Sequence, residues 1–311
     1  MRVVLVDPSR TVLKFVGRLL EAREHEVRAF TDGRAALAYI RTDPGVGALV
    51  TSAELVSMSG MELCWETRLL ATPGRPIYVI LMSSSQDRHK LIEALDSGAD
   101  DYIGKPPIAE ELYARLRAAE RVATMQRELL RLATTDPLTD VFNRRAFFER
   151  AAEVCARAEA GGALSAIVFD IDHFKRINDI YGHDVGDKAI RAVAGEAAAE
   201  DGIVGRLGGE EFAILLEGRD LGQAIEVGER LRRKIAALQF TTDNGAMTLT
   251  CSFGIGAWER GDNIDLLLKR ADVALYAAKT GGRNRVVATD AGRQVNETAM
   301  VESFVRSASR G

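Results

Sequence analysis

Two acidic residues follow a pair of glycines at positions 208–212, which read Gly-Gly-Glu-Glu-Phe. Apolar, strand-like runs flank this string at 203–207 and 212–216. A glycine pair between two strands is typical of a tight hairpin turn with positive φ, and it lets a ligand lie close to the backbone. Adjacent carboxylates repel one another, so the string has two interpretations: a solvated acidic turn, or a turn that binds a cation.

A further carboxylate stands where a side chain should be buried. Asp170 comes at the end of the apolar run 163–171, and a buried carboxylate is costly unless it binds something. A polar segment follows at 177–187, and a cationic one lies at 275–286. Carboxylates suit a hard cation, cations suit phosphates, and an Asn/Asp pair suits the edge of a base. Together these blocks predict a nucleotide site.

These blocks, in this order, resemble the GGDEF family of diguanylate cyclases, with the Glu variant of its signature hairpin. The segment 136–145 is similar to the entry motif of the family, although Asp140 and Val141 replace the usual Gly and Leu. The resemblance covers 136–289 and implies an enzyme that condenses two GTP molecules into cyclic di-GMP and two pyrophosphates. One domain offers only a half-site, so the resemblance also implies a homodimer with one GTP per half-site.

The resemblance assigns roles to individual residues. The groups that it implies for Mg²⁺ (or Mn²⁺) are Asp170, Glu210 and the carbonyl of Ile171, and the implied catalytic residues are Glu210 and Glu211. The implied substrate-binding residues are Phe174 and Lys175 at the terminal phosphates, Lys279 and Arg283 along the triphosphate, and Asn178 and Asp187 at guanine. Hard oxygen ligands suit Mg²⁺. An Asp at the base favours GTP over ATP, because adenine has an acceptor at the ring position where guanine donates.

The segment 199–202 departs from the family. Many members carry an Arg-x-x-Asp inhibitory site there, whereas this chain reads Ala-Glu-Asp-Gly. Without the Arg there is no bidentate clamp for a product phosphate or guanine. The sequence therefore predicts that the primary product-inhibition site is absent.

Short apolar runs alternate with segments of helical period through residues 1–120, which predicts a doubly wound, five-stranded parallel sheet. The region resembles the receiver domain of response regulators, whose pocket positions fall on Asp7, Pro8, Ser52, Ser83 and Lys105. Pro8 replaces the usual second acidic residue, and Ser52 replaces the phosphoacceptor Asp. We expect a degenerate receiver that works without Asp phosphorylation, with Lys105 paired to Asp7 and an unknown regulatory protein docking on it.

Residues 108–134 contain no Gly or Pro and are rich in helix formers. Two apolar series run through them: Leu112, Leu116, Ala119 and Ala123, and the offset set Val122, Met125, Leu129 and Leu132. We interpret 108–135 as a helical stalk that pairs with a second copy, with a register shift in the middle. The alternative is one long helix packed on its own domain.

The elements expected beyond the stalk give an α+β domain at 136–289 with a mainly antiparallel sheet similar to a polymerase palm. One strand is expected at 247–256 and a last one at 285–288. The segment 290–311 is polar and aperiodic, which is typical of a loose tail.

Composition limits the partners. A formal charge of −4, from 41 Lys+Arg against 45 Asp+Glu, argues against bulk nucleic-acid or membrane binding. The three widely spaced cysteines indicate a reducing, cytoplasmic setting. Two other functions remain open: a non-catalytic sensor of GTP or cyclic di-GMP, and a dimerisation module controlled by a partner. An undamaged hairpin favours the enzyme.

Overall fold

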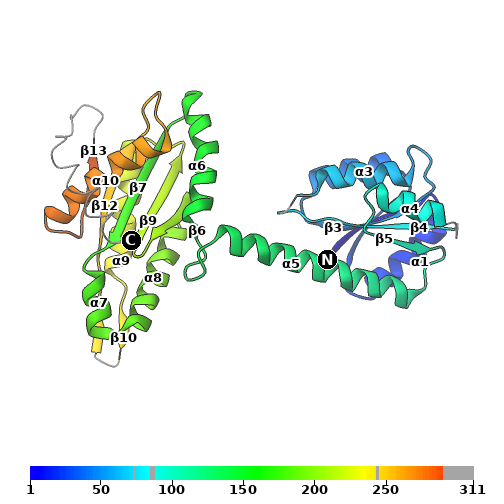
Figure 1. Ribbon diagram of the computed structural model, residues 1–311, viewed down its shortest axis with the longest axis horizontal. Helices are drawn as coiled ribbons and strands as arrows, with labels where there is room; N and C mark the ends of the chain where they lie inside the picture. The colour runs from blue at the N-terminus through cyan, green and yellow to red at the C-terminus, as the bar shows by residue number, and fades with distance from the viewer. Residues whose placement is uncertain (73, 85–87, 243–244, 290–311) are drawn as a thin grey trace. The chain divides into compact units, whose positions relative to one another are not determined.

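The computed structural model describes residues 1–289 apart from 73, 85–87 and 243–244. The chain divides into two compact units between Arg131 and Leu132, within one long helix (Figure 1). Each unit has its own hydrophobic core. Across the described ranges, no helix combines the length and the apolar character needed to cross a membrane. The expected tail at 290–311 lies outside the described residues.

The described part of the first unit contains the predicted sheet of five parallel strands, and their order is β2-β1-β3-β4-β5. The strands are β1 (Arg2–Val6), β2 (Glu26–Phe30), β3 (Val46–Ser52), β4 (Tyr78–Ser83) and β5 (Asp101–Gly104). The helices are α1 (Arg10–Glu21), α2 (Gly33–Thr42), α3 (Gly60–Leu70), α4 (Arg88–Asp96) and α5 (Ala109–Thr134). Side chains of β1 alternate between two cores, Val4 and Val6 in one and Val3 and Leu5 in the other, so the sheet is buried on both faces.

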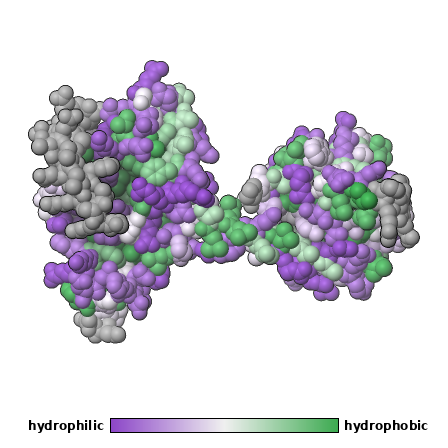
Figure 2. Space-filling model, viewed as in Figure 1, coloured by the Kyte–Doolittle hydropathy of each residue, from purple (hydrophilic) through white to green (hydrophobic). Residues whose placement is uncertain are grey.

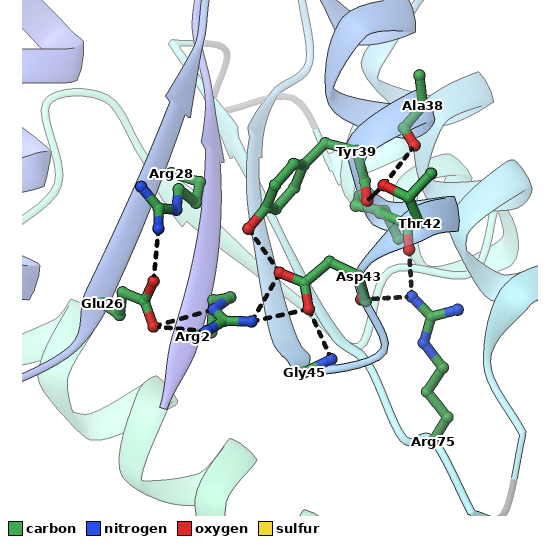
Figure 3. Close-up of polar contacts among 10 residues, drawn as sticks. Arg2, Glu26, Arg28, Ala38, Tyr39, Thr42, Asp43, Gly45 and Arg75 are labelled. Atoms are coloured by element: carbon green, nitrogen blue, oxygen red, sulfur yellow. Dashed lines mark hydrogen bonds and ion pairs between the residues drawn. The ribbon is translucent and has the colours of Figure 1, made fainter.

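A polar network around Asp43 ties the amino ends of β1 and β3 together (Figure 3). Arg2 Nη1 donates to the Asp43 carboxylate at 2.7 Å, and the Tyr39 hydroxyl donates to it at 2.5 Å. The backbone N–H of Gly45 adds a bond of 2.9 Å. The hydrogen bond from Tyr39 is the main cause that lowers the pKa of Asp43. The network thus holds the amino ends of these strands. Functional groups of such folds gather at the other end of the sheet, at the carboxyl ends of the strands.

Helix α5 combines the two interpretations offered by its sequence. The series Leu112, Leu116 and Ala119 is almost fully buried in the first unit. These residues therefore belong to the core of their own domain, and the interpretation of this series as a pairing seam was wrong. The second series is exposed: Val122 (42%), Met125 (64%), Leu129 (64%) and Leu132 (57%). Figure 2 shows hydrophobic side chains along this part of α5. The shift of spacing marks the change from core packing to an exposed stripe.

Within the described part of the second unit, six strands form one sheet in the order β13-β12-β7-β9-β8-β6. The strands are β6 (Phe142–Asn143), β7 (Leu164–Ile171), β8 (Ile203–Gly208), β9 (Glu211–Glu217), β12 (Cys251–Ala257) and β13 (Val286–Thr289). The helices are α6 (Arg144–Glu159), α7 (Phe174–Tyr181), α8 (His183–Ala198), α9 (Leu221–Ala236) and α10 (Ile264–Thr280). The pairs β12–β7, β7–β9 and β9–β8 are antiparallel, and only the two edge pairs are parallel. The α+β prediction is confirmed.

The single strand expected at 247–256 is two elements. Met247 ends β11 (Gly245–Met247), which pairs with β10 (Phe240–Thr242) in a separate hairpin. The ladder of the large sheet then resumes at Cys251. Thr250, just before β12, contacts Asp172 twice: its carbonyl accepts from the Asp172 N–H at 2.8 Å, and its hydroxyl donates to the Asp172 carboxylate at 2.7 Å. The short strands β6 and β10 were not predicted, since neither is long enough to show a periodic pattern.

Candidate active site

Asp170 lies near the end of β7, the central strand whose residues are all buried. Its exposed fraction is 8%. Antiparallel pairing places it directly opposite Glu211, the first residue of β9. On the other side, Lys279 Nζ from the last turn of α10 lies 3.0 Å from Asp170 Oδ2. The sheet register therefore brings together two carboxylates and one cation that are far apart in the sequence.

The signature hairpin joins β8 to β9 through a turn at Gly209 and Glu210. Gly209 has φ of 50°, a conformation that favours glycine, and this confirms the predicted turn. No heavy atom lies within 4 Å of a Cβ built on Gly208 or Gly209, so the backbone here is open to a ligand. Glu210 projects from the turn itself, whereas Glu211 belongs to the sheet. The two acidic residues therefore hold different positions.

Burial is the largest influence on the Asp170 carboxyl, and it raises the pKa to about 6. Lys279 opposes this rise through its charge and its hydrogen bond, whereas Glu210 and Glu211 add to it through their negative charge. The strand end is thus a place where negative charge accumulates and positive charge is stabilised.

The two residues expected at guanine lie on neighbouring helices. Asn178 is on α7 and Asp187 is on α8, and Gly182 with φ of 84° turns the chain between them. The Asn178 Oδ1 atom is buried and has no hydrogen-bond partner among the described residues. A Cβ on Gly186 would lie 1.9 Å from that oxygen, so a larger residue at 186 would displace the Asn178 amide. An unpartnered buried amide oxygen is costly unless a ligand satisfies it.

Helix α7 begins without a side-chain cap. Its N-cap residue is His173, which has φ of 56° and makes no capping hydrogen bond. The N–H groups of the first turn, including those of Phe174 and Lys175, can therefore receive an anion. The Lys175 side chain is exposed at the same helix start. The uncapped first turn and the exposed Lys175 side chain are thus both accessible to an anion.

Arg283 follows the end of α10 in a tight loop. It has φ of 63° and Asn284 has φ of 42°, so two successive residues adopt the left-handed region. The Arg283 N–H donates to the carbonyl of Ala278 at 3.0 Å, which closes the loop onto the helix that carries Lys279. The two expected phosphate-binding cations therefore come from one helix end.

Two sets of contacts beside the candidate site were missed by the sequence reasoning. Arg206 Nη1 lies 2.9 Å from Asp136 Oδ1, and Arg206 Nε donates to the carbonyl of Gly209 at 2.8 Å. Asp172 is buried two residues after Asp170 and accepts several hydrogen bonds. Asp172 could have been found from its spacing, because residues i and i+2 of a strand point to one face.

The receiver positions converge at the carboxyl ends of the first sheet. Lys105 Nζ lies 2.5 Å from Asp7 Oδ2 and donates to Ser52 Oγ at 2.6 Å. The expected pairing of Lys105 with Asp7 is confirmed. Pro8 is exposed and Ser83 is buried at the end of β4. Ser52 also accepts from the backbone N–H of Glu54, whose side chain is exposed. The Lys105 ammonium therefore bridges Asp7 and Ser52 at the carboxyl ends of β1 and β3.

The segment 199–202 is engaged within the second unit. Glu200 is buried and forms ion pairs with Arg230 and with Lys234, the latter at 3.1 Å. These bonds lower the pKa of Glu200, with the Arg230 hydrogen bond as the largest cause. Asp201 pairs with Arg219 at 3.3 Å. The acidic groups of this segment are thus satisfied by the cations of the fold itself.

Two family models match the chain: "Diguanylate cyclase, GGDEF domain" at residues 133–285 and "Response regulator receiver domain" at residues 3–117. The response regulator PleD of Caulobacter vibrioides is 36% identical over 300 residues, which cover 92% of this chain and 65% of PleD. The diguanylate cyclase DgcP of Pseudomonas aeruginosa is 41% identical over 192 residues, which cover 57% of this chain and 29% of DgcP. The chain thus spans less than two thirds of the length of either relative.

A solved structure gives the same result. The coiled coil and GGDEF domain of DgcB from Caulobacter crescentus, in complex with c-di-GMP, matches with 34% identity and a TM-score of 0.53. The match covers 58% of this chain and 98% of that one. The chain belongs to the GGDEF family and carries a response-regulator receiver domain ahead of its GGDEF domain.

Proposed function

We propose that this chain is a diguanylate cyclase, which joins two GTP molecules into cyclic di-GMP and releases two pyrophosphates. The observation that carries the proposal is the pairing of buried Asp170 with Glu211 across the sheet, with Lys279 Nζ 3.0 Å from the Asp170 carboxylate. Carboxylates and a cation thus stand beside a hairpin whose glycines are open to a ligand. Family membership and the relatives described as diguanylate cyclases support it.

We assign a divalent cation, Mg²⁺ or Mn²⁺, to Asp170, Glu210 and the carbonyl of Ile171. Asp170 fits this role because burial raises its pKa, and a bound cation would favour its ionised form. No three His, Cys, Asp or Glu side chains enclose a metal ion in the described ranges, so phosphate oxygens and water would complete the shell, as Mg²⁺ prefers. The bound metal would supply positive charge at the reacting phosphate and would acidify the attacking hydroxyl.

The residues of the chain itself bind and orient GTP. Asn178 and Asp187 hold guanine, and the groups that hold the phosphates are the first N–H groups of α7, Lys175, Lys279 and Arg283. The 3′-hydroxyl oxygen of one GTP bonds to the α-phosphorus of the other while the α–β anhydride bond breaks and pyrophosphate leaves. Glu210 accepts the hydroxyl proton. A second, equivalent step closes the ring.

Catalysis requires two copies of the chain, because one GGDEF domain holds one GTP. We propose a homodimer in which the stalk, residues 108–135, raises the effective concentration of one domain at the other. The exposed stripe from Val122 to Leu132 supports this role. In this arrangement residues 1–120 form the receiver and 136–289 the cyclase, in the cytoplasm. A regulatory protein, rather than Asp phosphorylation, would act on the receiver.

Turnover of GTP by the full chain tests the proposal. With Mg²⁺, Asp170→Asn and Glu210→Gln should each lower cyclic di-GMP formation by roughly 100-fold or more, because such metal stabilisation is worth several kcal/mol. The matched control is Asp265→Asn, which removes the same charge from the exposed first turn of α10. Equal rates in all variants would overturn the assignment, and GTP binding without any product would favour the sensor.

The same assay tests the missing inhibitory site. Because Glu200 is already held by Arg230 and Lys234, we propose that cyclic di-GMP added to the assay inhibits weakly. Strong inhibition that is lost on substituting 199–202 would contradict this.

A further inference from the structure

Asp172 is a buried carboxylate to which the mechanism gives no role. It follows β7 directly, and it is 6% exposed. Its Oδ1 accepts from the Ser252 hydroxyl at 2.6 Å, and its Oδ2 accepts from the Thr250 hydroxyl at 2.7 Å. Thr250 lies just before β12, and Ser252 is the second residue of that strand. These two short bonds, one to each carboxylate oxygen, hold the Asp172 side chain in one orientation.

The third bond connects Asp172 to the phosphate side of the site. The backbone N–H of Asn284 donates to Asp172 Oδ2 at 3.0 Å. Asn284 and its neighbour Arg283 both have left-handed φ, a conformation that costs energy for residues other than glycine. A backbone held in such a conformation needs fixed partners, and Asp172 supplies one of them.

We propose that Asp172 is a positioning residue that holds the 283–284 loop so that Arg283 meets the triphosphate of GTP. The inference rests on the proposed function, because it assigns Arg283 to the phosphates. Asp170 and Asp172 then divide the work at the end of β7. Asp170 contacts Lys279 and the reacting groups, whereas Asp172 contacts the backbone that carries Arg283. The phosphate-binding cations of α10 and its loop are thus both anchored to one strand end.

Neighbouring contacts hold the other side of the same loop. Arg232 Nη1 from α9 donates to Asn284 Oδ1 at 2.9 Å, and the Phe253 N–H donates to the carbonyl of Arg285 at 2.9 Å. These contacts fix the ends of the loop. The bond from the Asn284 N–H to Asp172 connects the backbone of the loop to the end of β7. Loss of Asp172 should therefore loosen Arg283 without unfolding the domain.

Equilibrium binding of two guanine nucleotides tests the proposal. The probes are guanosine 5′-(α,β-methylene)triphosphate, which cannot be turned over, and GMP, which lacks the outer phosphates. In the full chain, Asp172→Asn should weaken binding of the triphosphate analogue by about tenfold, the usual effect of a lost hydrogen bond to a charged group. The affinity for GMP should stay unchanged. Asp265→Asn, on the exposed first turn of α10, is the control for charge.

A double-mutant cycle separates positioning from general damage. In an Arg283→Ala background, Asp172→Asn should cause no further loss of affinity for the triphosphate analogue. Equal weakening of both nucleotides, no weakening, or full additivity with Arg283→Ala would overturn the proposal. If Asp172→Asn does not fold, Ser252→Ala and Thr250→Val, which remove the hydroxyl donors, are measured in the same way. A wild-type chain that binds the analogue no better than GMP would instead contradict the proposed function.

Discussion

Arg206 links the entry of the GGDEF domain to its signature hairpin. Its guanidinium pairs with Asp136 at 2.9 Å and donates to the carbonyl of Gly209 at 2.8 Å. Burial opposes the ionised form of Asp136, but the hydrogen bonds of Arg206 and Thr139 outweigh it, and the pKa of Asp136 is lowered. Because Asp136 lies two residues after the end of α5, one side chain joins the helix exit to the turn that carries Glu210.

We therefore expect Arg206→Lys to slow the cyclase, because lysine keeps the charge but cannot contact both groups. A displaced hairpin should cost roughly 10- to 100-fold in the rate of cyclic di-GMP formation. The measurement is the initial rate at saturating GTP. The control is Arg219→Lys, since Arg219 pairs with the exposed Asp201. A rate equal to that of the control would show that the contact is only structural.

The exposed stripe of α5 should mediate dimerisation. Leu129 is 64% exposed, and burying a leucine against a second copy is worth about 1.5–3 kcal/mol per side chain. Leu129→Glu should therefore shift the chain toward monomer in sedimentation at micromolar concentration, and activity should fall with it. Thr124→Glu adds the same charge to a residue outside the stripe and should remain dimeric. A dimeric Leu129→Glu variant would place the interface elsewhere.

The receiver should not be phosphorylated on a carboxylate. Ser52 stands at the end of β3 and accepts a hydrogen bond from Lys105, and a hydroxyl cannot form an acyl phosphate. Incubation with acetyl phosphate and Mg²⁺ should leave the intact mass of the chain unchanged. A labile gain of one phosphoryl group would contradict this, and the site of the label would identify the acceptor.

The stability of the first unit should fall in mild acid because of His25. Burial is the main cause that lowers its pKa, and the N-terminal charge adds to this, while Glu120, 3.8 Å away, opposes it. The unfolded chain then binds the proton more readily than the folded one. Stability is therefore present above the ordinary value of about 6.5 and is lost as the pH falls below it. Denaturant unfolding of His25→Gln should show a smaller loss between neutral and mildly acidic pH. An equal loss in wild type and variant would exclude His25 as the cause.

Periodic sequence patterns predicted most of the fold. The helices predicted at 174–181 and 264–280 begin and end where the structure places them, because amphipathic periodicity is a local signal, and Asn263 also caps the second helix. The single strand predicted at 247–256 was wrong, since Met247 pairs with Phe240 in a separate hairpin, and no local pattern separates that hairpin from β12. The series Leu112, Leu116 and Ala119 has the spacing of a pairing seam as well as of a core face, and only burial distinguishes the two.

The resemblance named the residues of the candidate site, but it did not predict the contacts between them. The resemblance assigned Asp170 and Lys279 to one site, and the register of β7 with β9 brings Glu211 to it. Asp136 was noticed only as part of an entry motif. Its pairing with Arg206 spans 70 positions, so no local pattern could indicate it. Contacts of this kind follow from the sheet register rather than from spacing.

Identification of the product tests the central claim most directly. The purified full chain is incubated with GTP and Mg²⁺, and the nucleotides are separated by chromatography and identified by mass spectrometry. The account predicts cyclic di-GMP with two pyrophosphates for each molecule formed, and no product when a chelator removes the metal or when Asp170 is replaced by Asn. Two results would contradict it: GTP that stays intact although the chain is dimeric, or GDP and phosphate as the products.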